Sequence, residues 1–110
     1  MTPPPIELTA RDQEVYEQEL QPWLPKRILD AHIHVFQRAC FPDSYTFPPK
    51  SCYLRFGGQH TIEQCLQIAG TLLPEAEFSC LCFGTPDTQV DREQAARYSG
   101  ETADNERVFG

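Results

Sequence analysis

The chain has 110 residues, of which 40% are hydrophobic and 23% are charged, a composition typical of one folded globular domain and not of a disordered chain. Its formal net charge of −7 argues against a nucleic-acid backbone as a partner. No apolar run approaches the roughly 20 residues that cross a bilayer. The opening stretch MTPPPIELTARDQ also lacks the positive and apolar regions of a secretory signal. We therefore expect a cytoplasmic chain with reduced cysteines and neither a nucleic-acid nor a membrane partner.

Residues 1–25 predict a proline-rich leader followed by a short helix. Thr9 is a typical helix N-cap, and Asp12 stands three residues later, close to the capping-box pattern. Pro22 and Pro25 are expected to end this helix, because proline lacks the N–H that a helix interior needs.

Residues 28–36, which read ILDAHIHVF, predict the first strand. A long loop is expected over residues 37–60, which contain several prolines and glycines and show no steady periodicity. Loops of this length in compact domains usually serve a function, and the aromatic residues in this one argue against disorder. We expect it to form a lid or a pocket wall.

Alternating helices and strands are expected after the loop. Thr61 predicts the N-cap of a helix over residues 62–73, and FSCLCFG at residues 78–84 predicts a strand buried on both faces. Residues 92–103 predict a further helix, and residues 107–110 resemble the start of another strand. This order indicates βαβ units, and hence an α/β fold with a parallel sheet. Because the units close no barrel, we expect the chain to be the N-terminal portion of a longer one.

The two faces of the first strand differ in chemistry. One face is expected to carry the even-numbered residues Ile28, Asp30, His32, His34 and Phe36, because side chains at i and i+2 share a face. The opposite face is expected to carry Leu29, Ala31, Ile33 and Val35 and to pack under helices.

Two histidines on one strand face can hold one metal ion. Their α-carbons would lie about 6.6 Å apart, and imidazole nitrogens bind zinc at about 2.0–2.1 Å. In parallel α/β folds such sites lie at the carboxyl ends of strands. We therefore predict that His32 and His34 are ligands of a divalent metal, zinc being the expected ion. Asp30 could accept a hydrogen bond from an imidazole or from neighbouring backbone. The alternative is that both histidines are core residues satisfied by hydrogen bonds.

The segment DAHIHVF resembles the opening His-x-His signature of the amidohydrolase superfamily. The helical leader and the loop-helix-strand-helix sequel are similar to its amidohydrolase-related branch, over residues 26–110. This resemblance implies the first βα units of a distorted (β/α)8 TIM-like barrel with one or two divalent metals at its mouth. It places two metal ligands at His32 and His34. The family's other ligands come from later strands, so the resemblance places no catalytic residue within this chain.

The activity that the resemblance implies is hydrolysis of an amide, ester or lactone by a metal-activated water. Some members of this branch instead decarboxylate aromatic or unsaturated acids, and the sequence does not separate the two. A third alternative is a non-catalytic fragment. The expected partner is a small-molecule substrate, and the chain could also form a homo-oligomer.

The remaining candidates have competing interpretations. Arg38 and Arg55 could bind a substrate carboxylate or could be solvated surface charges. His60 is expected to be a surface or loop residue. Cys80 and Cys82 are expected to pack as small hydrophobic residues, because the chain has no C-x-x-C pair of the kind that structural zinc sites use.

Overall fold

The computed structural model describes residues 6–110, so the first five residues of the predicted leader lie outside the described residues. The elements follow in the order α1 (Ala10–Val15), β1 (Arg27–His34), α2 (Ile62–Leu72), β2 (Glu77–Phe83), α3 (Arg92–Thr102) and β3 (Val108–Phe109). Each lies within about two residues of its predicted position, except that α1 continues as a π-helical segment, Tyr16–Leu20. Two short 3-10 helices, Arg38–Cys40 and Cys52–Phe56, interrupt the predicted loop.

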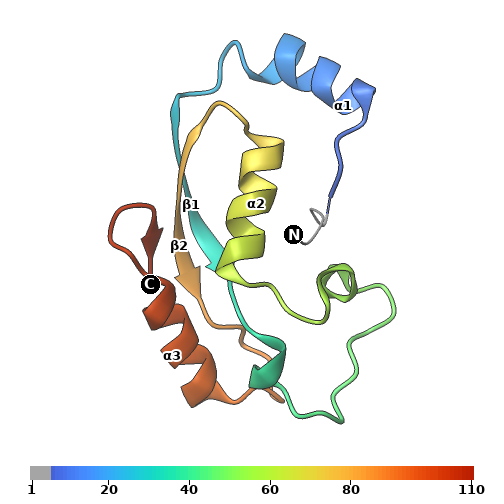
Figure 1. Ribbon diagram of the computed structural model, residues 1–110, viewed down its shortest axis with the longest axis vertical. Coiled ribbons are helices and arrows are strands. Elements are labelled where there is room, and N and C mark those ends of the chain that lie inside the picture. The colour runs from blue at the N-terminus through green and yellow to red at the C-terminus, as the bar shows by residue number, and fades with distance from the viewer. Residues whose placement is uncertain (1–5) are drawn as a thin grey trace.

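The three strands form one parallel sheet in the order β1-β2-β3 (Figure 1). The predicted α/β class with parallel strands is therefore confirmed. The described residues form an open sheet with β1 and β3 at its edges, and they do not close a barrel. Figure 1 shows α1 beyond the end of the sheet where β1 begins, away from the other two helices.

Local hydrogen bonds begin the helices where the sequence predicts. At Thr9 and at Thr61 the side chain accepts from the backbone N–H three residues later, and that residue's side chain accepts from the cap's N–H. Asp91 caps α3 by accepting from Gln94 N–H. These reciprocal bonds satisfy backbone donors that a helix start leaves unpaired. The N-caps predicted at Thr9 and Thr61 are thus confirmed, and both form complete capping boxes.

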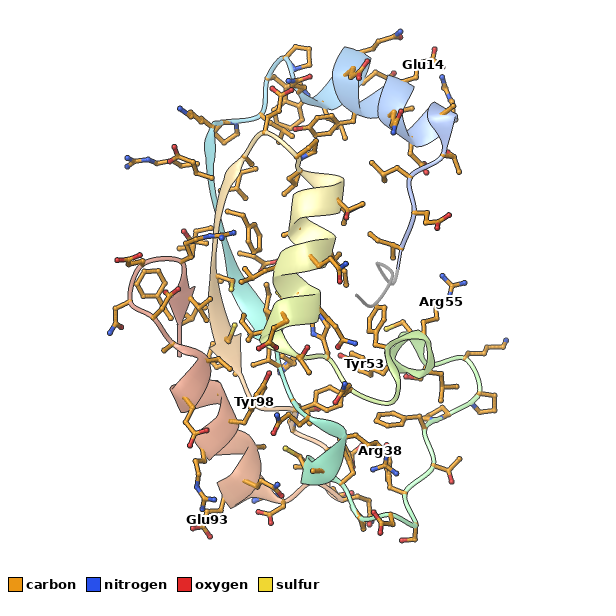
Figure 2. The ribbon with its side chains drawn as sticks, in the orientation of Figure 1. Glu14, Arg38, Tyr53, Arg55, Glu93 and Tyr98 are labelled. Atoms are coloured by element: carbon orange, nitrogen blue, oxygen red, sulfur yellow. The ribbon has the colours of Figure 1, made fainter. Side chains whose placement is uncertain are left out.

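One face of the sheet packs against α2 and α3. This main core consists of Val35, Ile62, Cys65, Ala69, Phe78, Cys80, Cys82 and Val108. Tyr98 of α3 also reaches the start of α2, where its hydroxyl accepts from Ile62 N–H at 3.0 Å (Figure 2). We call this side of the sheet the covered face and the other side the open face. No helix within residues 6–110 is both long and apolar enough to cross a membrane.

The loop of residues 37–60 has a core of its own. This cluster joins loop residues to Phe36, which follows β1, and to residues in or just before α3. Its buried members are Phe36, Cys40, Phe41, Phe47, Val90 and Ala95. Tyr45 and Tyr53 pack against this cluster, and Tyr45 donates from its hydroxyl to Asp87 at 3.0 Å. Aromatic packing therefore orders a segment that has little regular secondary structure.

Candidate metal centre

A bulge in β1 decides which side chains reach each face of the sheet. Asp30 pairs with Cys80 and Ile33 pairs with Cys82, so three steps along β1 match two along β2. An extra residue of this kind shifts the alternation of side chains by one. Residues on opposite sides of the bulge therefore follow different alternations.

The expectation that all even-numbered residues of this strand share one face is wrong. Ile28 lies before the bulge and Ile33 lies after it, yet both pack against the main core on the covered face. Asp30 is paired with the buried Cys80 and so lies on the covered side, not beside the histidines. The physical reason is the bulge, which a strict period-2 pattern does not contain.

Both histidines lie after the start of the bulge and share the open face. His34 pairs with Phe83, whose side chain is exposed on that face. The His32 ring lies 5.9 Å from the Phe83 ring and 4.9 Å from the His34 ring, measured between centroids. The two Nε2 atoms are 3.1 Å apart. The predicted convergence of the two imidazoles is thus present in the structure.

A backbone carbonyl fixes the orientation of one ring. His34 Nδ1 lies 3.1 Å from the carbonyl oxygen of Gly84, the residue that follows β2. Because a carbonyl oxygen can only accept, Nδ1 carries the proton of the neutral ring, and the Nε2 lone pair faces His32 Nε2 at hydrogen-bonding distance. This arrangement is common for metal-binding histidines, whose second nitrogen donates to a carbonyl or carboxylate. Nearby, Val35 N–H donates to Phe83 O at 2.8 Å and joins the same two strand ends.

The pair fits two positions of a metal coordination sphere. Two nitrogens 3.1 Å apart, each at the usual distance of about 2.0–2.1 Å from one ion, subtend about 100° at that ion. That angle is close to the tetrahedral geometry that zinc prefers. His32 is exposed and His34 is half-buried, so an ion could reach both from solvent. Within residues 6–110, however, no group of three or more His, Cys, Asp or Glu side chains is arranged around one ion.

Asp30 contacts the backbone and not an imidazole in this structure. Its Oδ1 accepts from the N–H of His32 at 3.0 Å, which is the second of the two roles expected for it. This bond lies within the bulge, between Asp30 and a residue two positions later in β1. The acceptor for an imidazole is instead the carbonyl of Gly84, which receives the hydrogen bond from His34 Nδ1. No sequence motif marks Gly84.

Arg38 is hydrogen-bonded to backbone carbonyls within the loop. Its two terminal nitrogens donate to the carbonyls of Phe41, Pro42 and Tyr45 at 3.0–3.5 Å. The guanidinium also lies 6.0 Å from the centre of the Phe47 ring (Figure 2). These contacts join the turns of residues 38–47 and engage the guanidinium, for which the sequence left open a substrate carboxylate or solvent as the partner.

Arg55 and His60 differ in exposure and in their contacts. Arg55 is exposed on the 3-10 helix Cys52–Phe56, and Figure 2 shows it on the outer side of that turn, away from the sheet. His60 is half-buried, and its Nδ1 lies 2.8 Å from the backbone oxygen of His34. His60 does lie in the loop, as expected. It is not a free surface residue, because its ring contacts the backbone oxygen of the candidate ligand His34.

The cysteines of the main core are packing residues. Cys80 and Cys82 are almost fully buried on the covered face, with their sulfurs 3.5 Å apart. Burial, with smaller effects from Cys80 and Asp30, raises the pKa of Cys65 and of Cys82 to about 12. A thiol with such a pKa stays protonated at neutral pH and binds metal poorly, because the ligand form is the thiolate.

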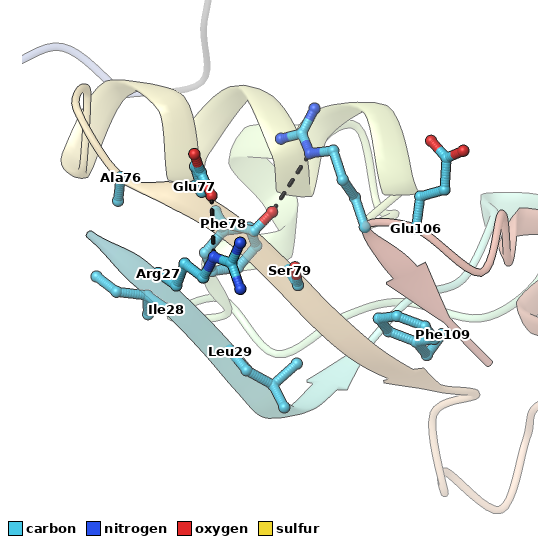
Figure 3. Close-up of a pocket in the computed structure, with 10 residues that line it drawn as sticks. Arg27, Ile28, Leu29, Ala76, Glu77, Phe78, Ser79, Glu106 and Phe109 are labelled. Atoms are coloured by element: carbon cyan, nitrogen blue, oxygen red, sulfur yellow. Dashed lines mark hydrogen bonds and ion pairs between the residues drawn. The ribbon is translucent and has the colours of Figure 1, made fainter. Parts of the chain in front are cut away.

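A concave region lies at the end of the sheet opposite the two histidines. It is a hollow of about 860 Å³ between the beginnings of the strands, and Figure 3 shows Arg27, Leu29 and Phe109 among its lining residues. Its two arginines are engaged there: Arg27 Nε lies 3.3 Å from a Glu77 oxygen, and Arg107 Nε donates to Phe78 O at 3.3 Å. The hollow therefore does not include the two histidines, which lie where β1 ends.

The chain matches no protein-family model, and neither a curated protein nor a solved structure matches it.

Proposed function

We propose that this chain carries part of the metal centre of a metal-dependent hydrolase that acts on an amide, an ester or a lactone. The observation that carries the proposal is the 3.1 Å approach of the His32 and His34 Nε2 atoms on the open face. The resemblance of DAHIHVF to the His-x-His signature of the amidohydrolase superfamily supports it. Zinc is the ion we propose, because imidazole nitrogens at this separation suit it.

Some residues of the site would bind the ion, and others would orient the groups that bind it. His32 and His34 would bind the ion through Nε2, and the Gly84 carbonyl would hold the His34 ring in the tautomer that binds. A bound divalent ion would polarise a substrate carbonyl and lower the pKa of a coordinated water. Phe83 lies beside both imidazole rings and limits the side from which a substrate could approach.

We propose that further ligands come from outside the described residues. A catalytic zinc site takes three protein ligands and keeps one position open, whereas the described residues bring two together. We propose that further βα units cover the open face, in the manner of a TIM-like barrel, and supply the remaining ligands. Parallel strands, helices on one face only and histidines at the end of β1 are the features that support this arrangement.

Metal titration tests the binding step. Zinc is titrated into the protein in competition with a chromophoric chelator, with His32→Ala and His34→Ala as test variants and Leu29→Ala as the matched control. Leu29 lies on the same strand, is exposed on the same face, and has an aliphatic side chain that cannot bind a metal ion. Both histidine variants should bind zinc more weakly by at least about tenfold, whereas the control should bind like the unmodified chain. Equal affinity in all four proteins would refute the metal centre.

Hydrolysis is tested separately. The test uses zinc-loaded protein that includes the further βα units proposed to supply the remaining ligands. p-Nitrophenyl acetate, an anilide and a lactone are suitable probes for the three substrate classes. Hydrolysis of any of them should disappear in His34→Ala and persist in Leu29→Ala. Release of carbon dioxide from an aromatic acid without any hydrolysis would replace the hydrolase assignment by the decarboxylase alternative.

A further inference from the structure

His60, the third histidine of the chain, is hydrogen-bonded to the end of β1 and to the residues that follow it. Phe36 N–H donates to His60 O at 2.9 Å, and His60 N–H donates to Phe36 O at 3.0 Å, which forms an isolated antiparallel bridge. The His60 ring adds a third bond, in which Nδ1 donates to the backbone oxygen of His34 at 2.8 Å. Three hydrogen bonds thus connect a residue at the end of the long loop to the segment 34–36.

This third bond acts on the residue that carries the candidate ligand. The backbone oxygen of His34 receives the bond from His60, while the ring of His34 donates to Gly84. His34 is therefore held on one side by the chain after β2 and on the other by the loop. The aromatic cluster of the loop includes Phe36, so its packing is linked to His34 through the backbone bridge between Phe36 and His60 and through the His60 ring.

Neighbouring rings fix the orientation of His60. The centroid of its ring lies 6.0 Å from that of Tyr53 and 5.8 Å from that of Phe56. Because the acceptor is a carbonyl oxygen, the proton of a neutral His60 must reside on Nδ1. The bond consequently requires a donor at the Nδ1 position and none at Nε2.

We propose that His60 is a positioning residue for His34, which fixes the backbone and so the imidazole of His34 at the distance from His32 that one ion requires. Its consequence for metal affinity rests on the proposed function, whereas its effect on the His34 ring does not. A purely structural role in the loop would change stability and leave the His34 ring and the metal affinity unchanged.

Three substitutions separate these roles. In His60→Asn the amide nitrogen can occupy the place of Nδ1, whereas in His60→Gln the amide reaches the place of Nε2, and His60→Ala has no donor. The first readout uses the metal-free chain and records the imidazole ¹⁵N shifts of His34. The unmodified chain and His60→Asn should show a single Nδ1–H tautomer, whereas His60→Gln and His60→Ala should show shifts averaged between tautomers.

The second readout is the affinity for Co²⁺, followed by its visible absorption, in variants whose circular dichroism shows a folded chain. His60→Asn should bind within about twofold of the unmodified chain, and the other two variants should bind about tenfold more weakly, the loss typical of groups that orient a ligand. Unchanged His34 shifts in His60→Ala and His60→Gln would overturn the positioning role. If the shifts change as expected but the unmodified chain binds no Co²⁺, the positioning role stands and the proposed function fails.

Discussion

The covered and open faces of the sheet belong to the same strands, but the covered face packs against helices and the open face carries the two imidazoles. On the covered face Phe78 is 8% exposed, and the neighbouring cysteines of β2 are almost fully buried. On the open face Leu29 is 61% exposed and Phe83 is 42% exposed, and the two imidazoles converge beside Phe83. One extra residue in β1 keeps apolar side chains on the covered face both before and after the bulge. Position relative to the bulge, and not even or odd number, therefore decides which side chains reach the site.

The largest contrast between the faces concerns stability. Phe78→Ala should reduce the free energy of unfolding by about 3–5 kcal/mol, because it leaves a cavity under α2. Leu29→Ala removes an exposed side chain from the same sheet and should change it by less than about 0.5 kcal/mol. Urea unfolding followed by circular dichroism measures both. If Phe78→Ala does not fold, Phe78→Leu should show a smaller loss in the same direction, and similar losses at Phe78 and Leu29 would contradict the assignment of the two faces.

A second pair of substitutions separates binding from packing. His34→Ala should weaken zinc binding by more than about tenfold and leave the free energy of unfolding within about 1 kcal/mol. Cys82→Ala should do the reverse, with an unchanged zinc affinity and a stability loss of about 1–2 kcal/mol from the small cavity that it leaves. Zinc titration and urea unfolding are run on the same preparations. A loss of zinc binding in Cys82→Ala would assign the metal to the covered face.

Thiol chemistry sharpens the comparison without any mutation. Cys52 is exposed, whereas the other four cysteines are buried, and burial raises the pKa of Cys65 and Cys82 to about 12. At pH 8 a disulfide reagent should therefore modify Cys52 quickly and the buried thiols only after denaturation. Mass spectrometry of the native protein counts the modified thiols. Rapid modification of a second thiol before unfolding would show that the covered face opens to solvent.

The smallest expected effect is a pH dependence at the edge of the sheet. Asp104 Oδ1 accepts from the backbone N–H groups of Val108, Glu106 and Arg107 at 2.8–2.9 Å, and these bonds lower its pKa from 3.8 to about 2. A carboxyl whose pKa is lowered by folding stabilises the fold above its unfolded pKa. That stabilisation should disappear as the pH falls from about 4 through about 2.

Hydrogen exchange at the amide of Val108 measures this effect, since the amide donates directly to Asp104. Protection should decrease between pH 4 and pH 2 beyond the intrinsic change in exchange rate. Asp104→Asn should weaken protection already at pH 5 and remove the pH dependence. A pH dependence that survives in Asp104→Asn would assign it to another group.

Local patterns in the sequence predicted most of the fold. The Thr61 capping box and the apolar face after it fix α2, because both depend on residues within three or four positions of each other. The apolar run 78–83 predicted β2 for a similar reason. The convergence of His32 and His34 also followed from a local spacing. Both histidines lie after the start of the bulge, so their side chains still share one face.

The features that the sequence did not predict depend on contacts between distant segments. The bulge exists only in the register of β1 against β2, so the wrong side was assigned to Asp30. Gly84 and His60 reach His34 from 50 and 26 positions away in the chain, and neither belongs to a motif. The carbonyls that Arg38 contacts lie in the loop of the aromatic cluster, whose conformation depends on packing against residues near α3. One signal was available: a histidine directly before a helix cap, at the end of a long loop, is a candidate to hold that loop to a strand.

The most direct test of the central claim, that His32 and His34 bind one ion together, is X-ray absorption at the zinc edge of the zinc-loaded chain. The account predicts nitrogen or oxygen neighbours at about 2.0–2.1 Å, with the multiple scattering of two imidazoles and no sulfur. It also predicts that His34→Ala reduces the imidazole contribution to one ring at most. A sulfur shell at about 2.3 Å would place zinc on a cysteine instead, and would contradict the account.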